Sequence, residues 1–177
     1  MAILTREQVA PEPPPSPRAT LKAIPDGAAG IRATLDEMVR LTRECRTNLM
    51  LRSLAEQIVT AVPGKSYFGE AAAIQSWVRS NIRYTGDIAE VETLKTPDQL
   101  VINRFGDCDD MSLLAGTLLQ TLGHPVRYVA VGRETGVFEH VFPETKIGNR
   151  WVAVETTEDV PLGWVPPDMP FRMVRHV

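Results

Sequence analysis

The spacing of apolar residues divides the chain into a helical part and a later part made of strands. Helical spacing begins near residue 34 and continues, with interruptions, to residue 122, and the alternation typical of strands begins at residue 126. Helices that precede a run of antiparallel strands, instead of alternating with strands, are typical of an α+β domain. The pattern therefore predicts an α+β fold with the helices first.

The first helical stretch begins at Thr34, which has the form of a capping box with the glutamate three residues later. Apolar residues then recur every three or four positions until a Pro-Gly pair ends the pattern. We interpret the stretch as one long helix, or as two helices with a break near Thr47-Asn48. Cys45 lies on the apolar side, where a free cysteine commonly packs as a small hydrophobic residue.

Three more helices and three strands follow. The spacing predicts helices over residues 70–82, 97–100 and 109–122, and the segment 84–96 is interpreted as a loop. The helix over 109–122 has the most regular apolar pattern, and a glycine and a proline end it. The strands are predicted over residues 126–131, 137–145 and 150–156, with a tight hairpin turn at 147–149 between the last two.

The N-terminal segment differs from the rest because prolines interrupt it repeatedly. Each proline fixes its own backbone and removes a hydrogen-bond donor, so residues 1–28 are predicted to form an extended arm. The remaining residues, 29–177, are enough for one domain with its own core. We expect a single active site within that domain.

Charge and composition exclude several classes of protein. The net charge is −3 and no long run of either sign is present, so nucleic acid is not an expected partner. No apolar run reaches the length of a membrane span, and the N-terminus lacks the pattern of an export signal. The expected location is therefore cytoplasmic, or virion-associated if the chain is encoded by a phage.

The cysteine content leaves a thiol for chemistry. The chain has 2 cysteines, Cys45 and Cys108, in unlike surroundings, and no Cys-x-x-Cys or His/Cys cluster. Neither a disulfide framework nor a metal site is expected, and no cofactor is implied. Cys108 is the candidate for a reactive cysteine.

Cys108 lies in the segment Gly106-Asp107-Cys108-Asp109-Asp110, where the most regular helix begins. Unpaired backbone N–H groups and the positive end of the helix dipole favour a thiolate there, and one of those N–H groups can stabilise an oxyanion. Asp107 is a plausible helix cap. The carboxylates of Asp109 and Asp110 act against thiolate formation, so activation by a histidine is expected.

Of the three histidines, His140 is the candidate base. His124 falls at the stop of a helix and His176 near the end of the chain, and both are better explained as structural or exposed residues. His140 lies in the strand before the hairpin, and Glu155 lies in the strand after it. Both registers of a two-residue hairpin loop place these two side chains on the same face, directly opposite in one and diagonal in the other. A carboxylate beside an imidazole holds the ring for catalysis.

These motifs resemble the bacterial and phage transglutaminase-like proteins. The segments, in the family's order over about residues 70–157, are Trp77-Val78-Arg79 with Ile82-Arg83-Tyr84, Thr96-Pro97, Gly106 to Asp110, Gly123 to Tyr128, His140-Val141 and Trp151 to Thr156. The resemblance implies a papain-like, transglutaminase-like core in which the cysteine helix packs on an antiparallel sheet. It assigns Cys108, His140 and Glu155 as nucleophile, base and orienting acid. The family's third residue is usually aspartate, so the glutamate is a departure.

Such a site forms a thioester from an amide and passes the acyl group to water or to an amine. The resemblance favours a thiol peptidase or amidase that acts on a peptide or protein substrate. Crosslinking by acyl transfer to an amine is one alternative. Another is a virion or assembly component that binds phage structural proteins through the proline-rich arm. Beyond the Cys108 amide the second oxyanion donor is not assigned, and Gln99 is only a weak candidate.

Overall fold

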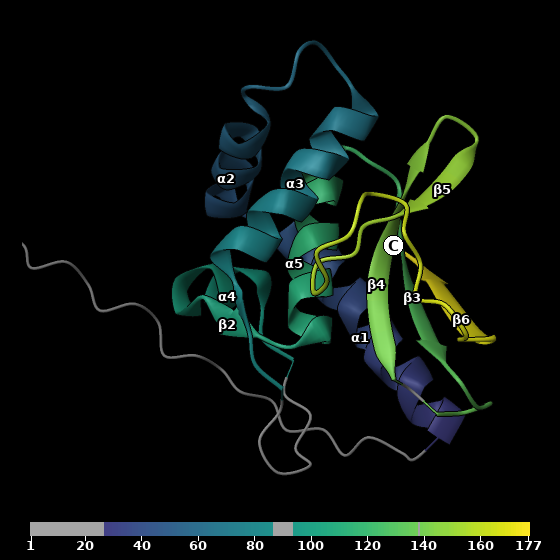
Figure 1. Ribbon diagram of the computed structural model, residues 1–177. Coiled ribbons are helices and arrows are strands. Elements are labelled where there is room, and N and C mark those ends of the chain that lie inside the picture. The colour runs from purple at the N-terminus through teal and green to yellow at the C-terminus, as the bar shows by residue number, and fades with distance from the viewer. Residues whose placement is uncertain (1–26, 87–93, 138) are drawn as a thin grey trace, which may run out of the picture.

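The computed structural model describes residues 27–86, 94–137 and 139–177, and Figure 1 shows helices on one side of the molecule and a four-stranded sheet on the other. The arm predicted over residues 1–28 lies almost wholly outside this part of the chain. Its last two positions belong to the first helix, which begins at Gly27. In the described ranges, no helix is both long and apolar enough to cross a membrane.

The first helical stretch forms two helices, α1 (Gly27–Cys45) and α2 (Leu49–Val59), as one of the two interpretations predicted. Asn48 caps α2, because its side chain accepts hydrogen bonds from the first backbone N–H groups of that helix. The predicted capping box at Thr34 is wrong. Thr34 is buried within α1, since the apolar face of the helix already begins at Ile31.

Helices α3 (Tyr67–Asn81) and α4 (Pro97–Asn103) correspond to the next two predictions. The helix predicted over residues 70–82 begins three residues earlier than expected because Ser66 caps it. Two short strands, β1 (Arg83–Tyr84) and β2 (Phe105–Gly106), pair in parallel and lead the chain to the next helix. Most of the predicted loop 84–96, residues 87–93, lies outside the described ranges.

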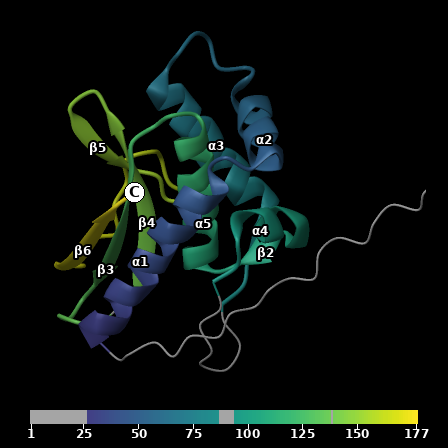
Figure 2. The same cartoon turned by 180° about the vertical axis from the view of Figure 1, so that it is seen from behind.

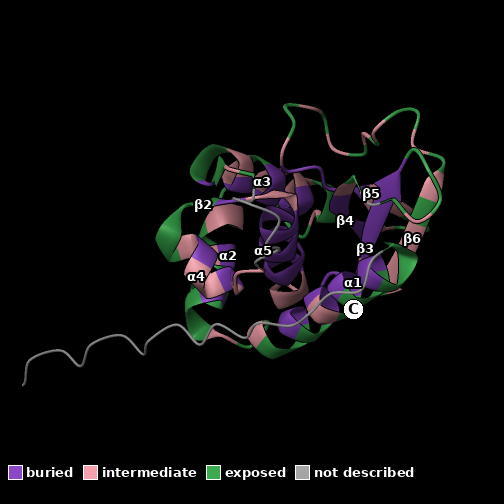
Figure 3. Ribbon diagram, turned by 90° about the horizontal axis from the view of Figure 1, so that it is seen from below, coloured by how far each residue is buried: buried purple, intermediate pink, exposed green. Residues whose placement is uncertain are grey.

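Helix α5 (Cys108–Thr121) is the central element of the fold. It contacts α1, α2, α3 and α4 as well as the sheet. Figure 3 shows the result, since α5 is buried over almost its whole length. Figure 2, which views the molecule from behind, shows α1 crossing in front of α5 and the sheet. The regular apolar pattern that predicted this helix thus reflects packing on several sides.

The sheet contains β3 (Val126–Gly132), β4 (His140–Ile147), β5 (Arg150–Ala153) and β6 (Phe171–His176), all antiparallel and in the order β5-β4-β3-β6. Ile147 pairs with Arg150, so the hairpin loop has two residues, Gly148 and Asn149. The predicted strand over 150–156 ends at Ala153, and the preceding strand is shifted to later residues. Strand β6 was not predicted, because its residues do not alternate between apolar and polar.

Close packing of α5 on the sheet depends on Gly116. A Cβ atom at this position would lie 2.3 Å from the hydroxyl oxygen of Tyr128 and within 2.9 Å of two ring carbons. The Tyr128 side chain is fully buried, and its hydroxyl lies 2.6 Å from the Thr42 hydroxyl of α1. The ring therefore joins α1, α5 and β3 and has little space into which to move.

We expect Gly116→Ala to lower the free energy of unfolding by about 2 kcal/mol. Overpacking costs about 1–3 kcal/mol, and the three close contacts place this cost at the upper end of the range. The higher helix propensity of alanine offsets about 1 kcal/mol of it. Urea denaturation measures the difference. Gly86→Ala is the matched control, because a Cβ atom there meets nothing within 4 Å. Equal stability of the two variants would contradict the packing argument.

Candidate active site

Cys108 is the first residue of α5, and the chain reaches it through a tight approach. Asp107 caps the helix as predicted, since its carboxylate accepts the backbone N–H of Asp110 at 3.1 Å. At Gly106 a Cβ atom would lie 2.6 Å from Asp110 Oδ2 and 2.9 Å from Leu100 Cδ1. Only glycine fits between these buried groups. The position of Cys108 is therefore fixed by packing on the residues before it.

Asp110 has a structural role beside the site. Its carboxylate is fully buried and accepts the backbone N–H of Lys95 at 2.7 Å and the Lys95 ammonium at 2.6 Å. These hydrogen bonds tie the segment before α4 to the first turn of α5. A buried carboxylate needs partners of this kind, because an unpaired charge in the interior costs several kcal/mol, on the order of its desolvation penalty.

The environment of the Cys108 sulfur disfavours the thiolate. Burial raises the pKa of the Cys108 thiol well above its usual value, and the carboxylates of Asp109 and Asp107 raise it further, while a backbone hydrogen bond from Val141 acts in the opposite direction. The thiol donates to Asp109 Oδ1 at 3.4 Å. The expectation that the helix N-terminus favours a thiolate is thus outweighed by burial and by two acids. Asp109 opposes ionisation as expected, but the second acid is Asp107 and not Asp110, whose carboxylate pairs with Lys95.

His140 and Glu155 are joined by a hydrogen bond. Nε2 of His140 lies 2.6 Å from Oε2 of Glu155, and the Glu155 side chain is 1% exposed. The register of β4 and β5 is the one in which Glu155 is the diagonal neighbour of His140. The prediction that both side chains lie on the same face is confirmed, although Glu155 follows the end of β5 and is not part of it.

The Glu155 carboxylate has further donors. Its Oε1 atom accepts the backbone N–H and the hydroxyl of Thr157, each at 2.7 Å. Burial alone would raise the pKa of this carboxyl group. The hydrogen bonds from His140 and Thr157 more than offset burial, so the pKa of Glu155 lies below its usual value. Glu155 is therefore held as an anion beside the imidazole.

Packing of α5 on β4 places Cys108 next to this pair. The backbone N–H of Val141, the residue after His140, reaches the Cys108 sulfur. One helical turn further on, the Ser112 hydroxyl donates to the Val141 carbonyl at 3.0 Å. Among the described residues the thiol makes its side-chain hydrogen bond to Asp109 and not to His140. Cys108, at the start of α5, thus packs against the stretch of β4 that carries His140.

The remaining candidates lie elsewhere. Gln99 is a half-buried residue of α4 without a described hydrogen bond, and it stays an unassigned oxyanion donor. His176 packs its ring on Trp151 at the far end of the sheet. The residues that sequence reasoning missed are Thr157 and Gln75. The Glu-x-Thr spacing was the available signal for Thr157, because a threonine commonly bonds to groups two residues away.

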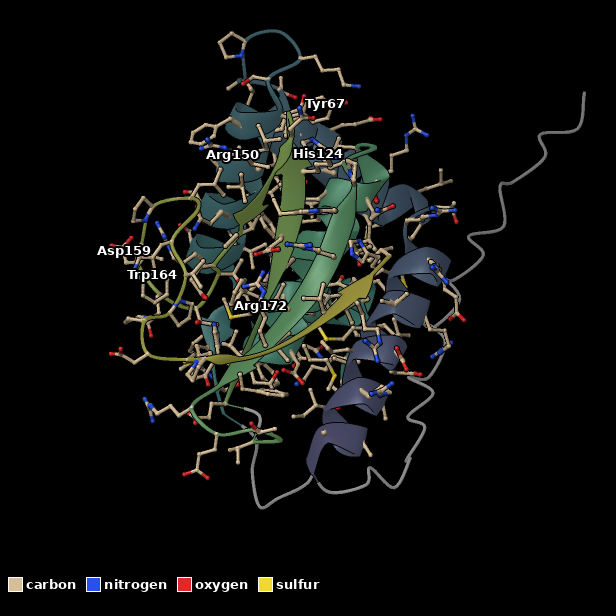
Figure 4. The ribbon with its side chains drawn as sticks, turned by 90° about the vertical axis from the view of Figure 1, so that its right-hand side faces the viewer. Tyr67, His124, Arg150, Asp159, Trp164 and Arg172 are labelled. Carbon is tan, nitrogen blue, oxygen red and sulfur yellow. The ribbon has the colours of Figure 1, made fainter. Side chains whose placement is uncertain are left out.

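His124 forms a second buried pair with a carboxylate. Its Nε2 atom lies 2.5 Å from Glu70 Oε2, and the edge of the Tyr67 ring contacts the imidazole, as Figure 4 shows near the top of the molecule. The imidazole does not bond to the carbonyl groups at the end of α5, since Nδ1 has no partner among the described residues. The residue instead joins the end of α5 to the first turn of α3. Its role is structural, as predicted.

We expect acid to destabilise the protein through His124. Burial lowers the pKa of His124 below the usual 6.5, so the unfolded chain binds a proton more readily as the pH falls below that value. The contribution of neutral His124 to the free energy of unfolding is complete above pH 6.5. It is lost as the pH falls toward the pKa of His124 in the folded protein. Urea denaturation at pH 7.5 and pH 5.5 measures the loss. His124→Asn should reduce this loss of stability, whereas His176→Asn, a control at an exposed position, should not. Identical losses in both variants would contradict the assignment of the acid sensitivity to His124.

Two hollows among the described residues are lined by none of Cys108, His140 and Glu155. One, of about 380 Å³, lies between the α1–α2 turn and the end of α5. The other, of about 560 Å³, lies along residues 166–170. No three His, Cys, Asp or Glu side chains within the described ranges are grouped so that they could hold a metal ion.

Solved structures share this fold. A proposed cysteine protease from Cytophaga hutchinsonii aligns with a TM-score of 0.53 and 20% identity over 78% of this chain and 51% of its own. A proposed protease from Parabacteroides distasonis aligns with a TM-score of 0.58 and 12% identity over 73% of this chain and 26% of its own. This chain thus spans about half, or about a quarter, of the length of those two proteins.

Calcium-bound LapG from Legionella pneumophila aligns over more of its own length. The TM-score is 0.52 and the identity 14%, over 76% of this chain and 80% of that one. Comparison with curated proteins found no match. At these identities the structural likeness establishes the fold.

Comparison with protein families gives a direct match. A model described as the transglutaminase-like superfamily matches residues 52–156, which is more than half of the chain. The match begins in α2, before the start predicted at residue 70, and it includes Cys108, His140 and Glu155. The chain belongs to the transglutaminase-like superfamily.

Proposed function

We propose that the protein is a cysteine-dependent amide-bond hydrolase in which Cys108 is the nucleophile, His140 the base and Glu155 the orienting acid. The observation that carries the proposal is the hydrogen bond between His140 Nε2 and the buried Glu155 carboxylate, one residue from the backbone that contacts the Cys108 sulfur. Likeness of the fold to proposed proteases supports hydrolysis over a binding role.

The proposed reaction begins with a proton transfer. Glu155 engages Nε2 of His140, so Nδ1 is the ring nitrogen that takes the proton of Cys108. Because burial and Asp109 favour the thiol in the free protein, this transfer accompanies substrate binding, when the sulfur turns from Asp109 to the imidazole. The resulting thiolate is paired with an imidazolium that the Glu155 anion stabilises.

The thiolate then attacks the carbonyl carbon of the substrate amide. The backbone N–H of Cys108, at the start of α5, is a donor to the oxyanion that develops on the carbonyl oxygen. The His140 imidazolium gives its proton to the leaving nitrogen, the C–N bond breaks, and a thioester to Cys108 remains. His140 next takes a proton from water, which attacks the thioester and releases the acid and the free thiol.

The test offers the full chain a diverse peptide mixture together with a primary amine and detects products by mass spectrometry. The proposal predicts carboxylic acid products that depend on Cys108. Products in which the amine is incorporated, dominating at modest amine concentration, would replace hydrolysis with acyl transfer. No Cys108-dependent product of either kind would overturn the enzymatic proposal in favour of a binding component.

A further inference from the structure

We propose that Thr157 is a positioning residue that keeps the Glu155 carboxylate ionised and turned toward His140. The inference deepens the proposed function and, as a statement about catalysis, rests on it. Its basis is a set of hydrogen bonds to the buried Glu155 carboxylate that the proposed chemistry does not itself require. Thr157 touches neither the substrate nor the sulfur in this proposal.

The two oxygens of the Glu155 carboxylate have separate partners. Oε1 accepts both the backbone N–H and the hydroxyl of Thr157 at 2.7 Å, and Oε2 accepts from His140 at 2.6 Å. A rotation of the carboxylate would break all three hydrogen bonds within a site where Glu155 is 1% exposed. Thr157 thereby fixes the orientation of the carboxylate, with one oxygen directed at the imidazole.

The segment that carries Thr157 is itself anchored to α3. Nε2 of Gln75, a residue that is 4% exposed, donates to the Glu155 carbonyl at 2.8 Å and to the Val160 carbonyl at 3.3 Å. Arg79 donates to the carbonyls of Glu158 and Val160 and pairs with Asp159. Figure 4 shows Asp159 on this loop, beside the sheet. Thr157 therefore lies between backbone positions that α3 holds on both sides.

The chemical effect of Thr157 follows from burial. A buried carboxyl group tends to take up a proton, since burial penalises the anion. Donors from the protein reverse this tendency, and Thr157 supplies two of the three that Glu155 receives. Removing the hydroxyl donor alone should make Glu155 easier to protonate, and a protonated Glu155 no longer stabilises imidazolium.

The chain offers a matched set of substitutions. Thr157→Val removes the hydroxyl and keeps the shape and the backbone N–H, while Thr157→Ser keeps the hydroxyl. Thr156→Val is the control, because the neighbouring Thr156 is 1% exposed and its hydroxyl has no hydrogen-bond partner among the described residues. Thermal unfolding of each variant reports any general loss of stability.

For Thr157→Val we expect kcat to fall about three- to tenfold with little change in KM, as for loss of one hydrogen bond to a charged group. The acid limb of the pH profile of kcat/KM should also move to higher pH, because the pKa of Glu155 rises. Thr157→Ser and Thr156→Val should retain the profile of the wild type. A purely structural defect would lower activity equally at every pH.

A titration separates this inference from the proposed function. Carbon-13 NMR of the Glu155 carboxyl carbon, in full-length Cys108→Ala protein, follows the ionisation without any turnover. The inference predicts a higher pKa for Glu155 in the Thr157→Val background than in the Thr156→Val background. An equal pKa in the two backgrounds would overturn it, whatever the activity assay shows. If the wild-type protein shows no activity in the product assay, the proposed function is overturned instead.

Discussion

Replacing Cys108 with alanine is expected to abolish product formation while the protein stays folded. Loss of a catalytic nucleophile lowers turnover by at least about a thousandfold, because no other group can form the thioester. Cys108 lies at the start of α5, where an alanine keeps the backbone and loses the two hydrogen bonds of the sulfur, with Asp109 and with the Val141 N–H. Mass spectrometry of products and thermal unfolding measure the two effects.

Cys45→Ala is the matched control for this experiment. Cys45 is the last residue of α1 and packs against the core, where burial raises the pKa of its thiol to about 11. Its loss should affect stability slightly and leave turnover intact. Activity that survives in Cys108→Ala, or that disappears in Cys45→Ala without unfolding, would show that the nucleophile has been assigned to the wrong residue.

Glu155→Gln is expected to lower turnover by up to about 10⁴-fold, the loss that follows when the orienting carboxylate of a catalytic triad becomes an amide. Thr157 directs two donors at Oε1, so the amide oxygen should remain there and the amide nitrogen should face Nε2 of His140. Because the amide nitrogen donates, Nε2 of His140 must accept this hydrogen bond. The proton of the neutral imidazole then lies on Nδ1. His140 could not take the proton of Cys108 in this tautomer.

Kinetics of the purified variants at several pH values measure the loss. Glu158→Gln is the control, since Glu158 is three residues away and exposed, and it should behave as the wild type. Equal activity of Glu155→Gln and the wild type would remove Glu155 from the proposed site. A comparable loss in Glu158→Gln would point to a general effect of charge on this loop.

Local patterns predicted the elements that hold the site. The apolar spacing of α5 and the turn residues of the hairpin predicted where Cys108 and His140 lie in the fold. That His140 and Glu155 share a face followed from a two-residue loop, because side-chain direction repeats every two residues, and the structure decided between the two possible registers. The wrong capping box at Thr34 shows the limit of a short motif, since α1 begins at Gly27 and Thr34 is buried on the side of that helix that faces the core.

Tertiary contacts explain what the sequence did not predict. Gln75 reaches Glu155 from a helix 80 residues earlier in the chain, and no local spacing encodes that contact. The position of β6 depends on pairing with β3 rather than on its own pattern. The state of the Cys108 thiol likewise depends on burial, which outweighs the helix dipole that sequence position suggests.

The most direct test of the central claim is to trap the acyl-enzyme. Full-length protein is mixed with a peptide substrate from the product assay, quenched in acid within the first turnovers, and digested for mass spectrometry. The account predicts a substrate acyl group on the peptide that contains Cys108, present in the wild type and absent in Cys108→Ala. Turnover that proceeds with the acyl group on another residue, or with full retention of activity in Cys108→Ala, would contradict it.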